Sequence, residues 1–307
     1  LPPGIFFQEL GYRYLGPIDG HNLAELLNVM KSLQNASGPL LLHVHSSKGK
    51  GSEFASKNPA MYHGLGNFDP VTGEIKNSNE KTFTATFGAE LVKLAEKNEN
   101  IEAISAAMIL GTGLSEFQQK FPDRCHDVGI AEEHSVIFSA GLAAGGKRPV
   151  CALYSTFAQR ALDCIYHDVV LAGLPVLFIL DRAGAVEDGP THHGIYELSF
   201  LRSLPNLPIM APRDENELAL MLRFALQLNG PAVIRYSKGA GARNKNFPLP
   251  TELTLGAAEI VQQGTGPVIW AMGAEVDTAF EVSELYEKQK EEKCLIINPR
   301  FISPFDK

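Results

Sequence analysis

Residues able to do chemistry recur in this sequence directly at the ends of short apolar runs. They are Glu132, Tyr154, Asp181, Arg182 and Arg235. A carboxylate can exchange protons, and arginine offers bidentate hydrogen bonds to a phosphate or a carboxylate. Brought together, these residue types would form a reactive pocket for an anionic substrate.

A Gly- and His-rich stretch after Arg182 adds further candidates for proton transfer. Asp188, His192 and His193 follow one another closely in this stretch. His63 stands apart, in a polar segment nearer the start of the chain. Histidine and aspartate are common general acids and bases, so Asp188, His192 and His193 extend the predicted pocket, whereas the pattern assigns His63 only to a loop.

The elements that position these residues follow a regular alternation from residue 83 onward. Short apolar runs predict strands at 101–106, near 125–130, and at 149–154, 175–180, 208–211 and 232–236. Helical patterns between them include 87–97, a helix starting near 132, 156–172 and one opened by Asp214, with Glu217 completing a capping box. This alternation predicts an α/β fold with a doubly wound parallel sheet. Ligands of such sheets bind beyond the carboxyl ends of the strands, where the candidate residues gather.

The flanking segments read as parts of further α/β domains. A turn is predicted at 16–20, a helix at 22–34 and a buried strand at 40–45, followed by a glycine- and lysine-rich turn at 48–51. That turn is either an anion-binding loop or a solvated basic turn. Residues 52–82 and 237–254 read as loops and linkers, and 267–298 as one more βαβ unit.

Composition sets limits on the function. The 307 residues are 45% hydrophobic and 20% charged, with a net charge of −8, which disfavours nucleic acid or an anionic membrane as the main partner. The four cysteines show no zinc-type spacing, so reduced thiols in a cytoplasmic protein are expected. The sequence begins at Leu1 without methionine and stops at Lys307, and we expect a piece of a longer protein.

Each candidate also has a purely structural interpretation. Glu132 and the adjacent Glu133 could simply favour a helix N-terminus through the helix dipole. Arg160 and Asp163 could pair across one turn of a helix. Residues 145–146 are best read as a helix stop, and 188–191 could be only a tight turn.

Five motifs resemble a known family. They are GPIDGH at 16–21, IAEEH at 130–134, YSTFAQR at 154–160, DRAG at 181–184 and DGPTHHG at 188–194. They are similar to the 1-deoxy-D-xylulose-5-phosphate synthases, thiamine-diphosphate enzymes of the transketolase superfamily. The resemblance runs nearly end to end and in the same order. It implies a homodimer that condenses pyruvate with glyceraldehyde 3-phosphate, using thiamine diphosphate and Mg²⁺.

The resemblance also implies roles for residues at the cofactor. Glu132 would bond the aminopyrimidine ring, Phe157 would stack on it, and Arg160 would make a contact from the cofactor side. Ser52 stands near the cofactor, at a position where the family commonly has tyrosine. The hard carbanion chemistry would belong to the cofactor.

Further roles concern the substrates. Tyr154, Arg182 and Arg235 match groups around the phosphate of the acceptor aldehyde. His63, Asp188 and His192 match polar groups near the reacting carbon, together with Glu132 as the catalytic set. The stretch between Arg182 and Asp188 is shorter than the family pattern.

The resemblance predicts three parts of the chain. Residues 1–78 would be the end of a diphosphate-binding domain plus linker, 79–245 the pyrimidine-binding domain, and 246–307 the start of the C-terminal domain. The family's metal motif, GDG followed by an Asn, does not occur in these residues, so no metal ligand is assigned and the isolated chain is expected to be inactive. A β-type subunit of a 2-oxo-acid dehydrogenase and a non-catalytic interaction paralogue stay as alternatives.

Overall fold

The computed structural model describes residues 4–64, 68–75, 81–242 and 250–306. The chain divides into two compact units, Leu1–Ser78 and Asn79–Lys307, and each is described by itself. The predicted domain boundaries at 78/79 and 245/246 lie outside the described residues. Within the described ranges, no helix is both long and apolar enough to cross a membrane.

The first unit is a parallel βαβ arrangement. Strand β1 (Arg13–Asp19) pairs with β2 (Leu40–His45), and helix α2 (Leu23–Leu33) connects them. Asn22 caps α2, because its side chain accepts a hydrogen bond from the backbone N–H of Glu25 at 3.2 Å. Two short helices, α1 (Ile5–Glu9) and α3 (Glu53–Lys57), flank the arrangement. The helix predicted at 22–34 and the strand at 40–45 are confirmed.

Two predictions for this unit were wrong. The turn expected at 16–20 lies mostly within β1, where a shift of register between Leu15 and Ile18 accommodates the Gly-Pro pair. Strand β2 is half-buried to exposed, not buried. Among the described residues of the unit, Ile18 is the only buried hydrophobic side chain. The described part of this unit therefore buries little apolar side-chain surface.

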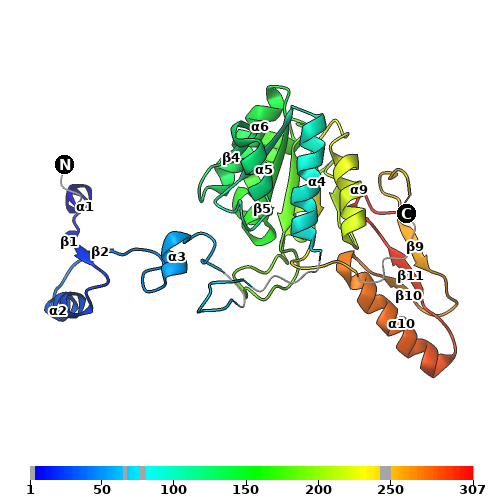
Figure 1. Cartoon of the computed structure of the whole chain (residues 1–307). Helices are drawn as coiled ribbons and strands as arrows, with labels where there is room; N and C mark the ends of the chain where they lie inside the picture. Colours follow the sequence, from blue (N-terminus) through cyan, green and yellow to red (C-terminus); the bar gives the residue numbers. More distant parts are fainter. Residues whose placement is uncertain (1–3, 65–67, 76–80, 243–249, 307) are drawn as a thin grey trace. The chain divides into compact units, whose positions relative to one another are not determined.

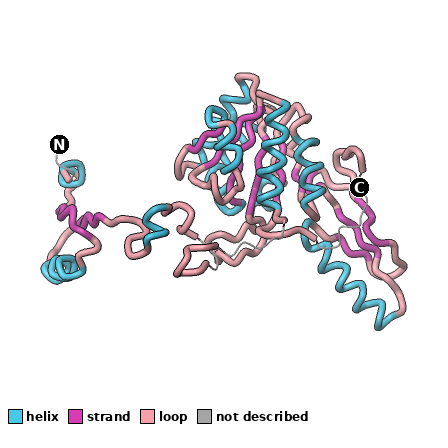
Figure 2. Tube along the Cα trace, in the orientation of Figure 1, coloured by secondary structure: helices cyan, strands magenta, loops and turns pink. Residues whose placement is uncertain are grey.

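The second unit is built on a seven-stranded sheet, visible as the magenta strands between cyan helices in Figure 2. Its order is β12-β7-β8-β6-β5-β3-β4. All neighbours pair in parallel except the edge strand β12, which is antiparallel to β7. The strands are β3 (Ile101–Ser105), β4 (Cys125–Asp127), β5 (Arg148–Tyr154), β6 (Leu177–Asp181), β7 (Ile209–Met210), β8 (Ala232–Arg235) and β12 (Phe301–Ser303). The predicted α/β class is confirmed.

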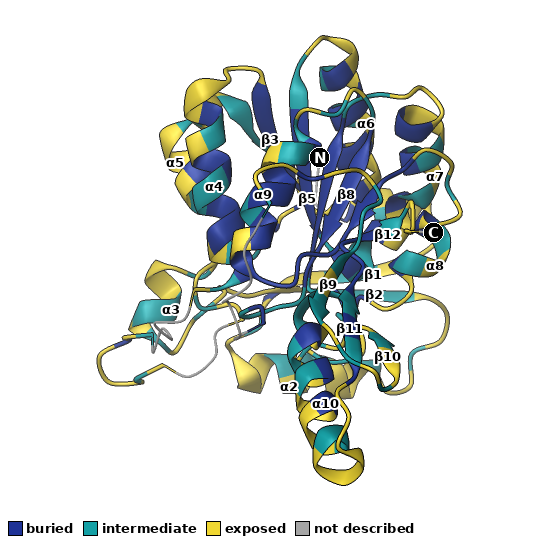
Figure 3. Cartoon of the chain, turned by 90° about the vertical axis from the view of Figure 1, so that its right-hand side faces the viewer, coloured by how far each residue is buried: buried dark blue, intermediate teal, exposed yellow. Residues whose placement is uncertain are grey.

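Helices cover both faces of this sheet. Val150 and Ala152 of β5 belong to one apolar core, whereas Cys151 and Leu153 belong to the other, as the alternation of a strand requires. The first core contains α4 (Phe83–Lys97), α5 (Ser115–Lys120) and α9 (Glu215–Ala225), and Figure 1 shows α4 beside α9. The second contains α6 (Glu132–Ala144) and residues around α8 (Glu197–Leu201). The central strands are buried, dark blue in Figure 3, because both faces are covered.

The helix predicted at 156–172 has a different geometry. It begins as a 3-10 helix, η2 (Ser155–Ala161), passes through one short α-helical stretch and continues as a π-helix at 165–170. A 3-10 helix has three residues per turn, so every third residue lies on one face. The residues buried in η2 are Ser155, Ala158 and Ala161, three small residues at this spacing. Because these three side chains are small, the backbone of η2 packs closely against the rest of the unit on this face.

The C-terminal segment forms a small sheet of its own. Strands β10 (Val268–Trp270) and β11 (Leu295–Asn298) are parallel and joined through α10 (Val276–Lys290), which confirms the predicted βαβ unit. Strand β9 (Glu259–Gln262) adds an antiparallel edge that the sequence pattern did not indicate. Strand β12 then returns to the large sheet.

A buried ionic network attaches this segment to the large sheet. Asp214 caps α9 as predicted, accepting from the backbone N–H groups at 216 and 217, both at 2.9 Å. Glu217 reaches back to the helix start, as a capping box predicts, but its Oε2 accepts from the N–H of Arg213, one residue before the cap, at 2.8 Å. Its carboxylate also binds Arg300 Nε at 2.7 Å and Asn298 at 3.2 Å. Arg213 extends the network to Glu259.

Candidate active site

Glu132 lies at the first position of α6, after a tight turn that leaves β4. Asp127 shapes this turn, because its Oδ1 accepts hydrogen bonds from the N–H groups of Ala107 (2.8 Å) and Gly129 (3.0 Å). Gly129 adopts a φ of 75°, which suits glycine. Strand β4 therefore ends at Asp127 and not near Ile130 as predicted. Glu132 itself is only 3% exposed.

Arg160 is the partner of Glu132. Its Nη1 lies 2.7 Å from Glu132 Oε1, and its guanidinium carbon lies 4.9 Å from the centre of the Phe157 ring. The alternative pairing of Arg160 with Asp163 does not occur, since Asp163 contacts His167 at 3.0 Å. A buried carboxylate is stable only with a partner, and Arg160 supplies it.

Tyr154 and Phe157 form an aromatic pair. Their rings stack at 5.9 Å between centroids with an angle of 16°. The His192 ring lies 5.5 Å from Phe157, edge to face, and 6.3 Å from Tyr154. Burial raises the pKa of the Tyr154 hydroxyl above its ordinary value, so it stays protonated at neutral pH. The pair offers a flat surface with a hydroxyl at one end.

Arg182 packs over the ring of Tyr154. Its guanidinium carbon lies 3.8 Å from the ring centre, and its Nη1 donates to the Gly111 carbonyl at 2.7 Å. The same nitrogen lies 3.2 Å from Asp181 Oδ1. Arg182 has a φ of 64°, a left-handed conformation that is strained for a side chain of this size and is typical of functional sites. The strand thus turns sharply to present this arginine.

Asp181 is a buried carboxyl group beneath Arg182. It has no exposed surface, and its Oδ2 accepts a hydrogen bond from the Thr84 hydroxyl at 2.6 Å. Burial raises the pKa of Asp181 to about 6, although Arg182 and Thr84 act in the opposite direction. Its role as a partner of Arg182 was not predicted from the sequence.

Asp188 is held by a lysine from another loop. Lys238 Nζ lies 3.2 Å from Oδ1 and 3.1 Å from Oδ2 of Asp188, and 2.7 Å from Glu187. Partial burial acts to raise the pKa of Asp188, but the hydrogen bonds and charge of Lys238 outweigh it, so the pKa lies below its ordinary value. Asp188 is therefore a carboxylate at neutral pH.

The loop that carries the histidines is closed by its own backbone. The His192 N–H donates to the Gly189 carbonyl at 2.9 Å, so the stretch at 188–191 is indeed a turn. A ring nitrogen of His192 lies 2.9 Å from the Thr191 hydroxyl. His193 instead contacts the Val186 carbonyl at 3.0 Å and fastens the loop to itself.

Arg235 ends β8 and is paired with a glutamate that the sequence gave no reason to select. Its Nε and Nη2 both lie 2.9 Å from Glu197 Oε1. Arg235 is 8% exposed and Glu197 is 1% exposed. No periodic or motif signal marks Glu197, because its partner is distant in sequence and its helix α8 has only five residues.

Two predicted residues lie in the first unit. Ser52 caps α3 by accepting a hydrogen bond from the Ala55 N–H at 3.3 Å. His63 is exposed in the loop that follows. The turn at 48–51 is closed by a hydrogen bond from the Ser52 N–H to the Gly49 carbonyl at 3.1 Å.

The second unit brings five of the predicted residues into one continuous series of contacts. Glu132 contacts Arg160, which lies over Phe157, which stacks on Tyr154, which lies under Arg182. In the part of the chain that the structure describes, there is no group of three or more His, Cys, Asp or Glu side chains suited to a metal ion. The series combines a carboxylate, two aromatic rings and two guanidinium groups.

Comparison of sequences extends these observations. Residues 79–243 match the family model described as transketolase, pyrimidine binding domain, and residues 1–46 match the model described as 1-deoxy-D-xylulose-5-phosphate synthase. The chain is 47% identical over 99% of its length to the 1-deoxy-D-xylulose-5-phosphate synthase of Methylacidiphilum infernorum. It is 48% identical over its whole length to 1-deoxy-D-xylulose-5-phosphate synthase 1 of Geobacter sulfurreducens. It spans about half of these curated relatives, 48% of each.

Comparison with solved structures identifies the fold. A chain titled split gene transketolase, inactive beta4 tetramer, superimposes with a TM-score of 0.65 at 26% identity, over 73% of both chains. A transketolase of Campylobacter jejuni shares the fold at 18% identity, with a TM-score of 0.64 over 98% of this chain and 58% of its own. The architecture is thus that of the transketolases. With the match over 79–243, the chain belongs to the transketolase pyrimidine-binding domain family.

Proposed function

We propose that the full-length protein condenses pyruvate with glyceraldehyde 3-phosphate, releasing carbon dioxide and forming 1-deoxy-D-xylulose 5-phosphate. The observation that carries this proposal is the buried Glu132, held by Arg160 beside the Tyr154–Phe157 pair. Identity of 47–48% to synthases of that name supports the choice of reaction. The match of residues 1–46 to the synthase model favours it over a 2-oxo-acid dehydrogenase subunit.

The residues of the second unit fit the pyrimidine end of thiamine diphosphate. Arg160 occupies Glu132 Oε1, whereas Oε2 makes no hydrogen bond to any described residue and is free to bind a ring nitrogen. Phe157 offers a face for stacking. When bound, the cofactor supplies the carbanion chemistry. Glu132 would orient the ring, and Arg160 would hold the Glu132 carboxylate in place. Mg²⁺ is the expected metal, with ligands outside this chain.

The arginines and the loop after Arg182 fit the acceptor aldehyde. Arg182 is fixed on Tyr154 and would bind the phosphate together with Arg235. Asp188 is ionised at neutral pH, so it would accept a proton or a hydrogen bond near the reacting carbon. His192 beside the aromatic pair, and His63 of the first unit, would serve proton transfer there.

The test is an assay of the full-length protein with thiamine diphosphate, Mg²⁺ and both substrates. We expect aldehyde-dependent consumption of pyruvate and formation of the phosphorylated ketose, with lipoyl-dependent consumption pointing instead to a dehydrogenase subunit. Glu132→Gln should abolish the activity, whereas Glu133→Gln, at the exposed neighbouring position, should retain it. If a Glu132→Ala protein kept its full cellular role, a non-catalytic interaction function would replace the proposal.

Three further parts of the proposal concern the protein as a whole. We expect a homodimer, measurable by sedimentation, and a cytoplasmic location, which the four free cysteines support. The isolated 307-residue chain should bind the pyrimidine end only and should not turn over. Turnover by this chain alone would contradict that expectation.

A further inference from the structure

Glu197 holds Arg235 by one edge of its guanidinium group. A single carboxylate oxygen, Oε1, accepts a hydrogen bond from Nε of Arg235 at 2.9 Å and also lies 2.9 Å from Nη2. The remaining nitrogen, Nη1, lies 3.8 Å from the sulfur of Met272. Sulfur is a weak acceptor, so the donors of Nη1 and the second hydrogen of Nη2 stay available to an anion.

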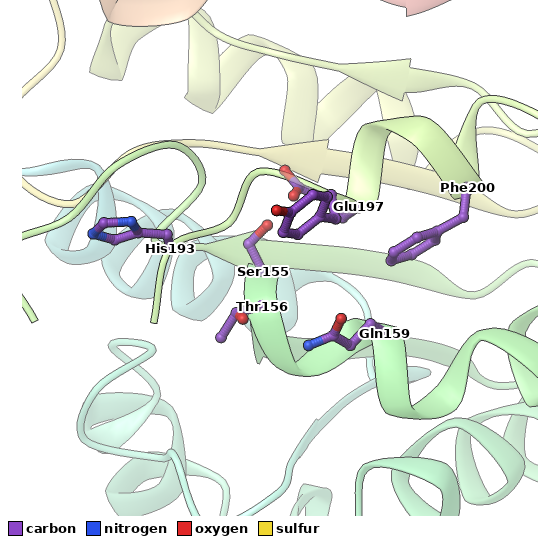
Figure 4. Close-up of a pocket in the computed structure, with 7 residues that line it drawn as sticks. Ser155, Thr156, Gln159, His193, Glu197 and Phe200 are labelled. Carbon is purple, nitrogen blue, oxygen red and sulfur yellow. The ribbon is translucent and has the colours of Figure 1, made fainter. Parts of the chain in front are cut away.

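Glu197 also lines a small polar cavity. Figure 4 shows Glu197 there with Ser155, Thr156, Gln159 and other residues. Glu197 Oε2 and Ser155 Oγ are both buried, and neither has a hydrogen-bond partner among the described residues. The cavity measures about 10 Å³, room for about one water molecule. A phosphorylated aldehyde does not fit there, so Glu197 can influence such a ligand only through Arg235.

We propose that Glu197 is a positioning residue: it fixes Arg235 so that the free edge of the guanidinium meets the phosphate of the acceptor. This inference rests on the proposed function, which assigns that phosphate to Arg235. Arginine has a long side chain with many rotamers, and anchoring one edge removes that freedom before the ligand binds.

The charge of Glu197 and its role as an anchor of Arg235 predict opposite effects on phosphate binding when Glu197 is removed. A carboxylate beside Arg235 repels an anion, so charge alone predicts tighter phosphate binding without it. Loss of the anchor predicts weaker binding, because Arg235 then loses its orientation. Arg235 is nearly buried, and Glu197 Oε1 lies 2.9 Å from two of its nitrogens, so we expect the effect of position to dominate.

The experiment uses the full-length enzyme with Glu197→Ala and Glu197→Gln. Glu197→Ala should raise the KM for glyceraldehyde 3-phosphate about tenfold or more, with the KM for pyruvate and the turnover of unphosphorylated glyceraldehyde within about twofold of wild type. Glu197→Gln keeps an acceptor but forms weaker hydrogen bonds, so it should raise the same KM by a few-fold only. This partial rescue is not expected of a purely structural role.

Glu217→Gln is the matched control. Glu217 is also a fully buried glutamate paired with an arginine, Arg300, but it lies in the network of α9 and β12. The Glu217→Gln variant should lower the midpoint of thermal unfolding. It should not raise the KM for glyceraldehyde 3-phosphate relative to the KM for pyruvate. If Glu197→Ala does not fold, Glu197→Gln alone tests the proposal. A rise in its KM for glyceraldehyde 3-phosphate, without a rise in the KM for pyruvate, supports the role of Glu197, and the absence of that rise overturns it.

Inorganic phosphate provides a readout that does not depend on turnover. Its dissociation constant, followed by phosphorus NMR, should rise in the order wild type, Glu197→Gln, Glu197→Ala. An unchanged or tighter constant, or an equal loss for both substrates, overturns the role of Glu197. A wild-type protein that binds phosphate in this order but forms no ketose product refutes the proposed function and leaves the positioning of Arg235 standing.

Discussion

Replacement of Asp181 by asparagine measures what a buried carboxylate costs this fold. Burial raises its pKa from 3.8 to about 6, even with Arg182 and Thr84 as partners. The folded protein therefore binds a proton at Asp181 more tightly than the unfolded chain does. Stability from this group is complete below about pH 4 and is lost as the pH rises through about 6. A difference of about two pKa units corresponds to about 3 kcal/mol.

The assay is urea unfolding of wild type and Asp181→Asn at a series of pH values. Trp270, the only tryptophan in the sequence, lies in the same unit and reports its unfolding by fluorescence. The free energy of unfolding of the variant, minus that of wild type, should rise by about 3 kcal/mol between about pH 4 and about pH 7. All other titrating groups are present in both proteins and cancel in this difference.

The control is Asp123→Asn, which changes an exposed aspartate of the same unit. It should show no comparable rise. A difference for Asp181→Asn that is independent of pH, or that falls with pH, would refute the reasoning. The more stable variant should also be the less active one, because Arg182 loses the charge that helps to orient it, a trade of stability against function.

Three other outcomes are expected from the contacts of the second unit. Glu132→Gln should lower turnover of the full-length enzyme about 100-fold or more while its urea midpoint stays close to wild type, checked by steady-state kinetics and unfolding curves. Phe83→Ala removes a fully buried ring that stacks on Tyr236 at 5.5 Å and should cost about 3–5 kcal/mol in unfolding free energy. Burial raises the pKa of Cys151 to about 11, so alkylation at neutral pH should leave it unlabelled until the protein is denatured, as read by mass spectrometry.

Local patterns in the sequence were sufficient for the main elements. The strand at 40–45 and the cap of α9 at Asp214 rest on neighbouring residues, and both are confirmed. Strand β1 was missed because Gly16 and Pro17 are typical turn residues, and only pairing with β2 keeps them in a strand. The 3-10 geometry of η2 was missed because the three-residue spacing of Ser155, Ala158 and Ala161 is also compatible with one face of an α-helix.

Partners distant in sequence could not be predicted. The positions of Arg182 and Arg235 at strand ends follow from the alternation of strands and helices. Arg182 contacts Asp181, its neighbour in sequence, but the contact of Arg235 with Glu197 depends on how α8 packs against the sheet. Glu217 shows the same limit: its spacing from Asp214 indicated the hydrogen bond back to the helix start, which it makes with the Arg213 N–H, but not its contact with Arg300, 83 residues away.

The arginines predicted for the site share one arrangement that bears on how an acidic chain can bind an anion. Arg160, Arg182 and Arg235 each contact a carboxylate that is at most 3% exposed. Each pair is close to neutral, so attraction of a phosphate by net local charge is small. The remaining N–H donors, however, are held in fixed directions, and fixed donors lose little entropy when a ligand binds. Affinity in such a site depends on geometry more than on charge, because the buried carboxylates fix the directions in which the remaining N–H donors point.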